Sequence, residues 1–202
     1  MIAIIDYGVG NVGSILNMMR KGGADAHVIS SADEIERAKK IILPGVGAFD
    51  NGMRSLRERG LVPALNLKVK EQGTPILGIC LGMQLFGRRS EEGTEEGMAW
   101  LDAESVKFRL NDSSPRLKVP HMGWNSVQPS SAQVNGFEDG ARFYFVHSYH
   151  LVCGNSEDVW ATTRYGYDFV AAVKRNNIWG VQFHPEKSHK YGLRLLQHFA
   201  ES

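Results

Sequence analysis

Short apolar runs alternate with amphipathic stretches along the first part of the chain. The apolar runs are residues 1–6, 26–29, 41–43 and 74–77. Each run is short enough to form a buried strand. Between the first two, apolar side chains repeat at the i, i+3, i+4, i+7 spacing of one helix face, starting at Val12, and Gly22 and Gly23 would end that helix. This alternation predicts a parallel sheet with crossover helices.

Two more helices are expected before the last of these strands. Asp50 can cap a helix that buries Met53 and Leu56, because its carboxylate can accept hydrogen bonds from the first turn. Pro63 suits the first position of the next helix, where no N–H is needed, and Gly73 would end that helix.

The second half of the chain has a different pattern, in which short β-rich runs follow two polar loops. The loops are an acidic segment at residues 90–97 and a turn-rich segment at 111–115 that we expect to be mobile. The candidate strands are residues 143–146, 159–163, 169–173 and, after a turn at 175–177, the return strand 178–183. Ser188 can cap a last helix, whose buried face would carry Gly192, Leu195, Leu196 and Phe199.

No linker separates these strands from the first half, so we expect residues 1–202 to form a single α/β domain. Its central sheet would be mostly parallel and flanked by helices, with additional antiparallel strands in the C-terminal half. A chain of 202 residues suits one such domain and can bury a sizeable core.

Composition and charge narrow the class of protein. The net charge is +1 and no long basic run occurs, which argues against nucleic acid as the main partner. No apolar stretch approaches membrane-spanning length, and the N-terminal run lacks the basic start of a signal peptide. The two cysteines, Cys80 and Cys153, are more typical of a reduced cytoplasmic protein than of a disulfide scaffold.

A glycine-rich segment follows the first strand and has two interpretations. The spacing Gly8-x-Gly10-x-x-Gly13 matches a dinucleotide-binding loop, but the acidic residue that would bind the ribose, Asp33, comes late. The alternative, which we favour, is a tight strand-to-helix turn with close packing. The nucleotide-binding interpretation would also leave the segment around Cys80 unexplained.

Cys80 lies in a pentad, Gly-Ile-Cys-Leu-Gly at residues 78–82, between a strand and a helix. This layout is typical of a nucleophile elbow, where small residues allow a tight turn. The helix N-terminus would favour a thiolate. A small buried core cysteine is the alternative, because free cysteines are often buried.

The return strand leads into His184 and Glu186, which could supply the rest of a catalytic triad. In an extended segment, residues i and i+2 point to the same side, so both side chains could face one site. A cysteine nucleophile needs a nearby base, and the base needs an orienting group. Cys80, His184 and Glu186 would fill these roles in that order.

Two motifs, Gly-Ile-Cys-Leu-Gly-Met-Gln at 78–84 and His-Pro-Glu at 184–186, resemble those of the class I, or triad, glutamine amidotransferases. Further segments narrow the resemblance to one family within that class, the glutaminase subunits of imidazole glycerol phosphate synthase, which act in histidine biosynthesis. These segments are residues 6–11, 43–47, 90–93, 121–125, 144–149 and 184–188. The resemblance covers essentially the whole chain.

The resemblance implies a thioester mechanism without cofactor or metal ion. Cys80 would attack the glutamine carboxamide, His184 would protonate the departing ammonia and then activate water, and Glu186 would orient His184. The N–H of Leu81 would be one oxyanion donor. The other would come from the strand at Gly45, Val46 and Gly47, after one of its peptide planes flips.

The resemblance also assigns residues to substrate and partner. Gln84, Glu92, Ser148 and Tyr149 match positions that hold the α-amino and α-carboxylate ends of glutamine, although Glu92 could equally be a solvated acid in its loop. Ammonia would pass to a cyclase subunit with a (β/α)₈ barrel, in a heterodimer. Met122, Trp124, Asn125 and Lys187 match interface positions; otherwise Trp124 would be a core aromatic and Lys187 a solvated charge.

Two alternatives stay open beside the nucleotide-binding one. A class I glutaminase could serve another acceptor, as in pyridoxal phosphate synthesis, but the segments at 121–125 and 144–149 argue against this. A non-enzymatic interaction module could also use this fold, but the intact set Cys80, His184 and Glu186 argues against that.

Overall fold

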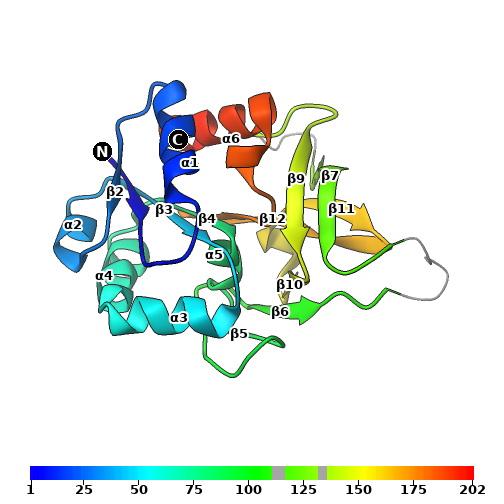
Figure 1. Ribbon diagram of the computed structural model, residues 1–202, viewed down its shortest axis with the longest axis horizontal. Helices are drawn as coiled ribbons and strands as arrows, with labels where there is room; N and C mark the ends of the chain where they lie inside the picture. The colour runs from blue at the N-terminus through cyan, green and yellow to red at the C-terminus, as the bar shows by residue number, and fades with distance from the viewer. Residues whose placement is uncertain (111–116, 132–135) are drawn as a thin grey trace.

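The computed structural model describes residues 1–110, 117–131 and 136–202, so the turn-rich segment at 111–115 lies outside the described residues. The architecture is an α/β fold around an eight-stranded sheet of strand order β2-β1-β3-β4-β13-β12-β11-β8 (Figure 1). Its first five strands in this order are parallel, and the last three are antiparallel. The expected fold class is therefore confirmed.

The strands of this sheet are β1 Ile2–Ile5, β2 Ala26–Ile29, β3 Lys40–Gly45, β4 Ile76–Cys80, β8 Gln128–Pro129, β11 Val159–Tyr165, β12 Tyr167–Arg175 and β13 Ile178–Val181. The α-helices are α1 Val12–Lys21, α2 Ala32–Glu36, α3 Phe49–Glu58, α4 Leu61–Asn66, α5 Leu81–Gln84 and α6 His189–Glu201. A π-helical turn, Leu67–Glu71, continues α4, and 3₁₀ turns span Ser156–Asp158 and Pro185–Lys187.

Two hydrophobic cores lie on opposite faces of the sheet. Alternation along β1 sends Ile2 and Ile4 into the core beneath α1 and α6, whereas Ala3 and Ile5 enter the core beneath α2, α3 and α4 (Figure 1). Burial on both faces explains why the parallel strands are continuous apolar runs in the sequence rather than alternating ones.

Two smaller sheets follow the elbow helix in the chain. One has the order β10-β6-β5, from Tyr149–Cys153, Ala103–Lys107 and Arg89–Ser90. The other pairs β7 His121–Ser126 with β9 Arg142–His147 in antiparallel register. The sequence predicted β9 but missed β5, β6, β7 and β10, because their many polar residues give no clear apolar alternation.

Three local details differ from the expectations. Ala48, not Asp50, is the N-cap of α3, and the Asp50 carboxylate instead accepts hydrogen bonds from the N–H groups of Thr94 and Glu95. Pro63 is the third residue of α4 rather than the first. Ser188 does occupy the N-cap of α6, but its hydroxyl makes no capping hydrogen bond.

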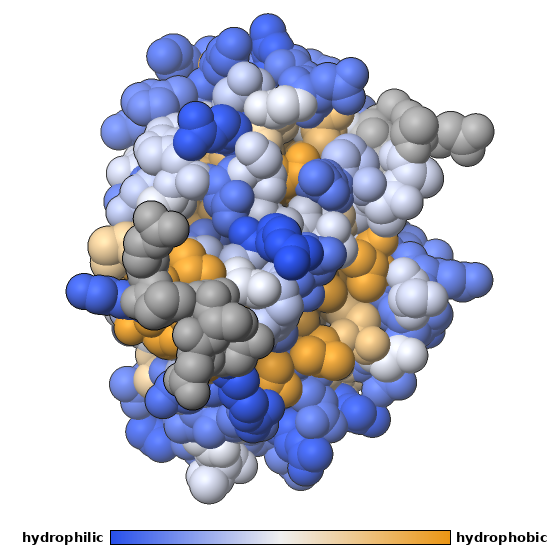
Figure 2. All heavy atoms as spheres, turned by 90° about the vertical axis from the view of Figure 1, so that its right-hand side faces the viewer, coloured by the Kyte–Doolittle hydropathy of each residue, from blue (hydrophilic) through white to orange (hydrophobic). Residues whose placement is uncertain are grey.

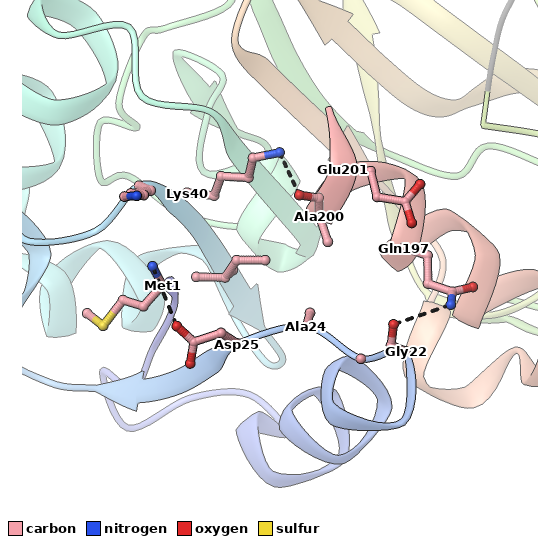
Figure 3. Close-up of a pocket in the computed structure, with 11 residues that line it drawn as sticks. Met1, Gly22, Ala24, Asp25, Lys40, Gln197, Ala200 and Glu201 are labelled. Atoms are coloured by element: carbon pink, nitrogen blue, oxygen red, sulfur yellow. Dashed lines mark hydrogen bonds and ion pairs between the residues drawn. The ribbon is translucent and has the colours of Figure 1, made fainter.

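The chain termini meet at the edge of the sheet where β1 and β3 begin, around a cavity of about 330 Å³ (Figure 3). There the Lys40 ammonium donates hydrogen bonds to the last carbonyl groups of α6, including those of Phe199 at 2.8 Å and Ala200 at 2.9 Å. These bonds satisfy carbonyls that have no partner within the helix. None of the predicted site residues lines this cavity.

Among the described residues, no helix has both the length and the apolar character that crossing a membrane requires.

Candidate active site

Cys80 occupies a sharp turn between β4 and α5. Its backbone has φ 55° and ψ −111°, a conformation that a non-glycine residue rarely adopts. The flanking residues must be glycines, because a Cβ at either position would clash with the neighbouring backbone. A Cβ at Gly78 would lie 2.7 Å from the backbone nitrogen of Met83, and one at Gly82 would overlap the carbonyl oxygen of Leu43. The pentad thus has the geometry of a nucleophile elbow.

His184 and Glu186 form a buried pair beside Cys80. Nδ1 of His184 lies 2.8 Å from Oε1 of Glu186, and both side chains are only 2% exposed. Burial lowers the pKa of His184, but the Cys80 sulfur and the Glu186 carboxylate raise it by more, to about 10. His184 therefore carries a proton at neutral pH.

The contact between His184 and Glu186 does not arise from the extended segment that the sequence predicted. Glu186 lies in the 3₁₀ turn Pro185–Lys187, not in an extended segment, so the expected i, i+2 alternation does not apply. The turn is fixed from outside: the N–H of His184 donates to the carbonyl of Tyr144 on β9, and the Ser188 hydroxyl donates to the carbonyl of His184. The Ser188 oxygen also accepts the N–H of Tyr144.

A cavity of about 390 Å³ opens at the carboxyl ends of β4 and β13, above this constellation. Its walls combine members of four predicted groups: two triad residues, part of the oxyanion set, the substrate-binding set and Lys187, whereas Glu186 and Gly45 do not line it. The lining residues are Val46, Gly47, Ala48, Cys80, Leu81, Gln84, Glu92, Val146, His147, Ser148, Tyr149, His184 and Lys187. Ligands of open α/β sheets bind at this edge.

The predicted oxyanion strand lies next to the elbow. Gly45 ends β3 opposite Cys80, and a Cβ there would lie 2.8 Å from the backbone nitrogen of Gly82. The Tyr7 hydroxyl donates a 2.7 Å hydrogen bond to the Pro44 carbonyl, which fixes the peptide before Gly45. Val46 and Gly47 are exposed beyond it, and Gly47 has φ +94°.

The predicted substrate-binding residues surround the same cavity. The Gln84 amide donates to the carbonyl of Tyr149 at 3.0 Å. The Glu92 carboxylate accepts the N–H of Phe49, at the start of α3, at 2.8 Å. Ser148 and Tyr149 enter from the β9–β10 corner. Glu92 is exposed to solvent, and its carboxylate both lines the cavity and is anchored to the start of α3.

A family model of known proteins, glutamine amidotransferase class-I, matches residues 3–201. The chain belongs to this glutamine amidotransferase family. It is 50% identical over 203 residues to "Imidazole glycerol phosphate synthase subunit HisH 2" of Pseudomonas aeruginosa, covering 100% of this chain and 99% of the relative. It is also 50% identical over 201 residues to the protein of that name from Methanococcus maripaludis, covering 98% of both.

Solved structures share the fold of this amidotransferase at much lower identity. The structure of PurLQS from Thermotoga maritima aligns with a TM-score of 0.76 at 19% identity, over 99% of this chain and 97% of the other. The glutaminase domain of CTPS from Trypanosoma brucei aligns with a TM-score of 0.63 at 18% identity, over 98% of this chain and 92% of the other. These matches support the fold only.

Of the predicted interface residues of the amidotransferase, Trp124 and Lys187 lie next to the catalytic turn, whereas the Asn125 amide faces His121 and the carbonyl of Arg164. Only Lys187 lines the cavity. Met122 is 61% and Trp124 40% exposed on β7, so Trp124 is not a core aromatic. Trp124 stacks on His189 at 5.4 Å, and the Lys187 ammonium lies 5.7 Å from the centre of the Tyr144 ring. Figure 2, viewed from the side of β7 and β9, shows hydrophobic groups at the surface among hydrophilic ones.

The glycine-rich segment of the amidotransferase is a packed turn. The Asp6 carboxylate accepts the N–H of Gly8 at 3.0 Å, and a Cβ at Gly10 would lie 3.1 Å from Cβ of Pro44. Asp33 lies within α2 rather than at the end of β2. These contacts support the tight-turn interpretation. Among the described residues, no group of three His, Cys, Asp or Glu side chains could hold a metal ion.

Sequence reasoning missed two residues at the amidotransferase cavity, Gln182 and His147. Gln182 is fully buried, and its amide nitrogen lies 3.7 Å from the Cys80 sulfur. It precedes His184 by two residues on the return segment, a spacing that could have flagged it. His147 lines the cavity and lies 3.1 Å from His121 between ring nitrogens. Nothing in the local sequence indicates this pair.

The two buried histidines should make the folded amidotransferase acid-sensitive. Burial lowers the pKa of His121 to about 4, and burial, only partly offset by the hydrogen bond to Tyr149, lowers the pKa of His147 to about 3. Below pH 6.5 the unfolded rings take up protons that the folded ones do not. For each ring, the free energy of unfolding should therefore fall by about 2 kcal/mol between pH 7 and pH 5.

Urea unfolding at pH 7, 6 and 5 measures this loss. His121→Phe keeps the ring stacking on Phe145 and Tyr165 but removes one titrating group. Its unfolding free energy should fall by about 2 kcal/mol less than that of the parent over this range. Equal losses in the two proteins would exclude His121 as a source of the acid sensitivity.

Proposed function

We propose that this chain is the glutaminase subunit of imidazole glycerol phosphate synthase and acts in histidine biosynthesis. The observation that carries the proposal is 50% identity over the full chain to subunits of that synthase. The cavity lined by Cys80 and His184, with Glu186 bonded to His184, supports it chemically. We treat residues 1–202 as one amidotransferase domain, because the family model spans 3–201 and one sheet joins both halves.

Hydrolysis of glutamine follows from the protonation state of the site. The His184 imidazolium stabilises a Cys80 thiolate, which attacks the side-chain carbonyl carbon of glutamine. The C–N bond then breaks, and His184 gives its proton to the departing ammonia, leaving a glutamyl thioester. Neutral His184 takes a proton from water, which attacks the thioester, and the thiolate leaves with release of glutamate.

Glu186 and the neighbouring backbone complete the machinery. Glu186 holds Nδ1 of His184 in the protonated tautomer, so that Nε2 serves the reacting atoms. Nε2 has no hydrogen-bond partner among the described residues, as a group awaiting substrate requires. The N–H of Leu81 and one from Gly45, Val46 or Gly47 would bind the oxyanion, and each such donor is typically worth about 3 kcal/mol of barrier.

The ends of glutamine would be held by side chains around the cavity. The Glu92 carboxylate suits the α-ammonium group, and Gln84, Ser148 and Tyr149 offer polar groups to the α-carboxylate end. Ammonia would pass to a cyclase subunit with a (β/α)₈ barrel, which makes imidazole glycerol phosphate and AICAR. Met122, Trp124, Asn125 and Lys187 would contact that cyclase. A reducing cytoplasm suits the enzyme, since both of its cysteines are free thiols.

The isolated chain should hydrolyse glutamine only weakly. It carries a glutaminase site but no region that resembles an acceptor synthetase, so activity without an acceptor would waste glutamine. The test is a glutaminase assay of the chain alone, with the cyclase subunit, and with the cyclase and its ribonucleotide ligand. Activity should rise at each step. Full activity of the isolated chain, unchanged by cyclase and ligand, would contradict the proposed assignment.

Lys187 should affect the coupling of the two reactions more than the association of the subunits. It is exposed, lies one residue beyond Glu186 and lines the cavity that holds Cys80. An ion pair at the rim contributes only about 0–1 kcal/mol to binding. In Lys187→Ala, glutamate should still form while less ammonia reaches the acceptor.

The measurement for Lys187→Ala is the ratio of glutamate to imidazole glycerol phosphate produced at saturating glutamine. The ratio should be near one in the parent and higher in the variant. If the variant keeps the parental ratio and the parental activation by acceptor, Lys187 is only a solvated charge.

A further inference from the structure

A buried side-chain amide, that of Gln182, contacts the Cys80 sulfur. Gln182 lies just beyond β13, is fully buried, and directs its Nε2 to the Cys80 sulfur at 3.7 Å. Its backbone is fixed by a 2.8 Å hydrogen bond to the carbonyl of Ala171 on β12. An amide does not titrate in the working range of an enzyme, so this group cannot act as an acid or base. It can only donate hydrogen bonds to the sulfur.

The orientation of the Gln182 amide follows from its neighbours. The Tyr149 carbonyl can only accept, so the atom of Gln84 that lies 3.0 Å from it must be the amide nitrogen. The same nitrogen donates to Oε1 of Gln182 at 3.0 Å. Since the oxygen of Gln182 faces Gln84, its NH₂ group must face Cys80.

The Tyr149 carbonyl also accepts a hydrogen bond from a second series of side chains, which runs through two buried histidines. Nδ1 of His147 lies 2.7 Å from the Tyr149 carbonyl and must carry a proton, which leaves Nε2 as an acceptor. Nδ1 of His121 then donates to it at 3.1 Å, and Nε2 of His121 accepts from the Asn125 amide at 3.4 Å. The Asn125 amide nitrogen is itself fixed by the carbonyl of Arg164 at 2.8 Å.

We propose that Gln182 is a positioning residue that holds the Cys80 sulfur as a thiolate aimed at the substrate. We also propose that the hydrogen bonds running from half-buried Asn125 through His121, His147 and the Tyr149 carbonyl to Gln84 fix its amide. A thiolate accepts an N–H bond more strongly than a thiol does, so the contact favours the attacking form. This proposal rests on the proposed role of Cys80 as nucleophile.

The test is the pH dependence of Cys80 alkylation by iodoacetamide in the full chain. A Cys153→Ala background leaves Cys80 as the one thiol. Gln182→Met removes the donor at similar volume, and Gln182→Glu replaces it with an isosteric carboxylate. The pH of half-maximal alkylation should rise by about one pH unit for Gln182→Met, and further for Gln182→Glu. For glutamine hydrolysis, kcat should fall about tenfold with little change in KM.

A matched pair of variants tests the series of hydrogen bonds that runs through the two histidines. His121→Phe breaks this series while keeping its ring contacts, and should shift the alkylation profile in the same direction by about 0.3–0.5 pH unit. Tyr165→Phe removes only a hydroxyl that bonds to Lys118, keeps the ring against His121, and should leave the profile unchanged.

Parental alkylation profiles in the folded Gln182 variants would overturn the proposal. If Gln182→Met does not fold, Gln182→Leu takes its place as the uncharged variant without a donor, because the new carboxylate of Gln182→Glu would disfavour the thiolate by charge repulsion alone. An equal shift in Tyr165→Phe and His121→Phe would overturn the part played by the histidines. Alkylation reports on the sulfur whether or not glutamine is the substrate. The two failures can therefore be told apart. If the Gln182 variants shift the alkylation profile but Cys80→Ala still hydrolyses glutamine, the proposed function is refuted and the contact between Gln182 and Cys80 is not.

Discussion

Replacing Cys80 with alanine should abolish glutamine hydrolysis, lowering kcat by more than about 10⁴-fold. The sulfur is the atom that would form the thioester, and Cys80 is the one thiol among the described residues that line the cavity. Cys80 sits at a strained elbow beside the protonated His184, so the site is built around this one side chain. The measurement is glutamate release by Cys80→Ala in complex with the cyclase and its ligand.

The matched control is Cys153→Ala. Burial, followed by the charges of Asp158 and Asp102, raises the pKa of Cys153 to about 12, so this thiol stays protonated and unreactive. Its replacement should leave glutaminase activity nearly intact. Robust turnover by Cys80→Ala, or loss of turnover in Cys153→Ala with the fold preserved, would refute the assignment of the nucleophile.

Replacing Glu186 with glutamine should lower kcat by about 10³-fold to 10⁴-fold while the chain stays folded. The Glu186 carboxylate accepts the Nδ1 proton of His184 in a buried contact of 2.8 Å. A neutral amide removes the charge that favours imidazolium, and its NH₂ group can turn His184 to the tautomer with the proton on Nε2. That tautomer cannot take a proton from water.

Glu104→Gln is the matched control for this variant, because the Glu104 carboxylate pairs with Arg88 and Arg89 on the surface. It should keep parental activity. The pH–rate profile separates a chemical role from a structural one, since loss of the carboxylate should move the limb assigned to His184 to lower pH. An unchanged profile and rate in Glu186→Gln would remove Glu186 from the triad.

The sequence alone determined the features that depend on short-range pattern. The strand–helix alternation follows from periodicity within windows of ten or so residues, and the structure confirms β1 to β4 with α1, α3 and α4; the short helix α2 was not predicted. The elbow around Cys80 was also predictable, because the need for small residues at Gly78 and Gly82 is imposed by the turn itself.

Other features were decided by partners far away in the chain. Asp50 is a plausible helix cap locally, but its carboxylate binds the loop at Thr94 and Glu95, which lies against it only in the folded protein. Strands β6, β7 and β10 were missed because their pairing partners, rather than their own alternation, make them strands. Both cases show tertiary contacts overriding local propensity.

The assembly of the site itself required the tertiary structure. Cys80 and His184 meet because β4 and β13 are adjacent parallel strands, with Ile79 opposite Val181. The sequence of one strand does not indicate which strand will pair with it. The sequence identified both residues, through their motifs. Only the packed sheet placed the Gln182 amide against the sulfur and joined it, through one backbone carbonyl, to two buried histidines.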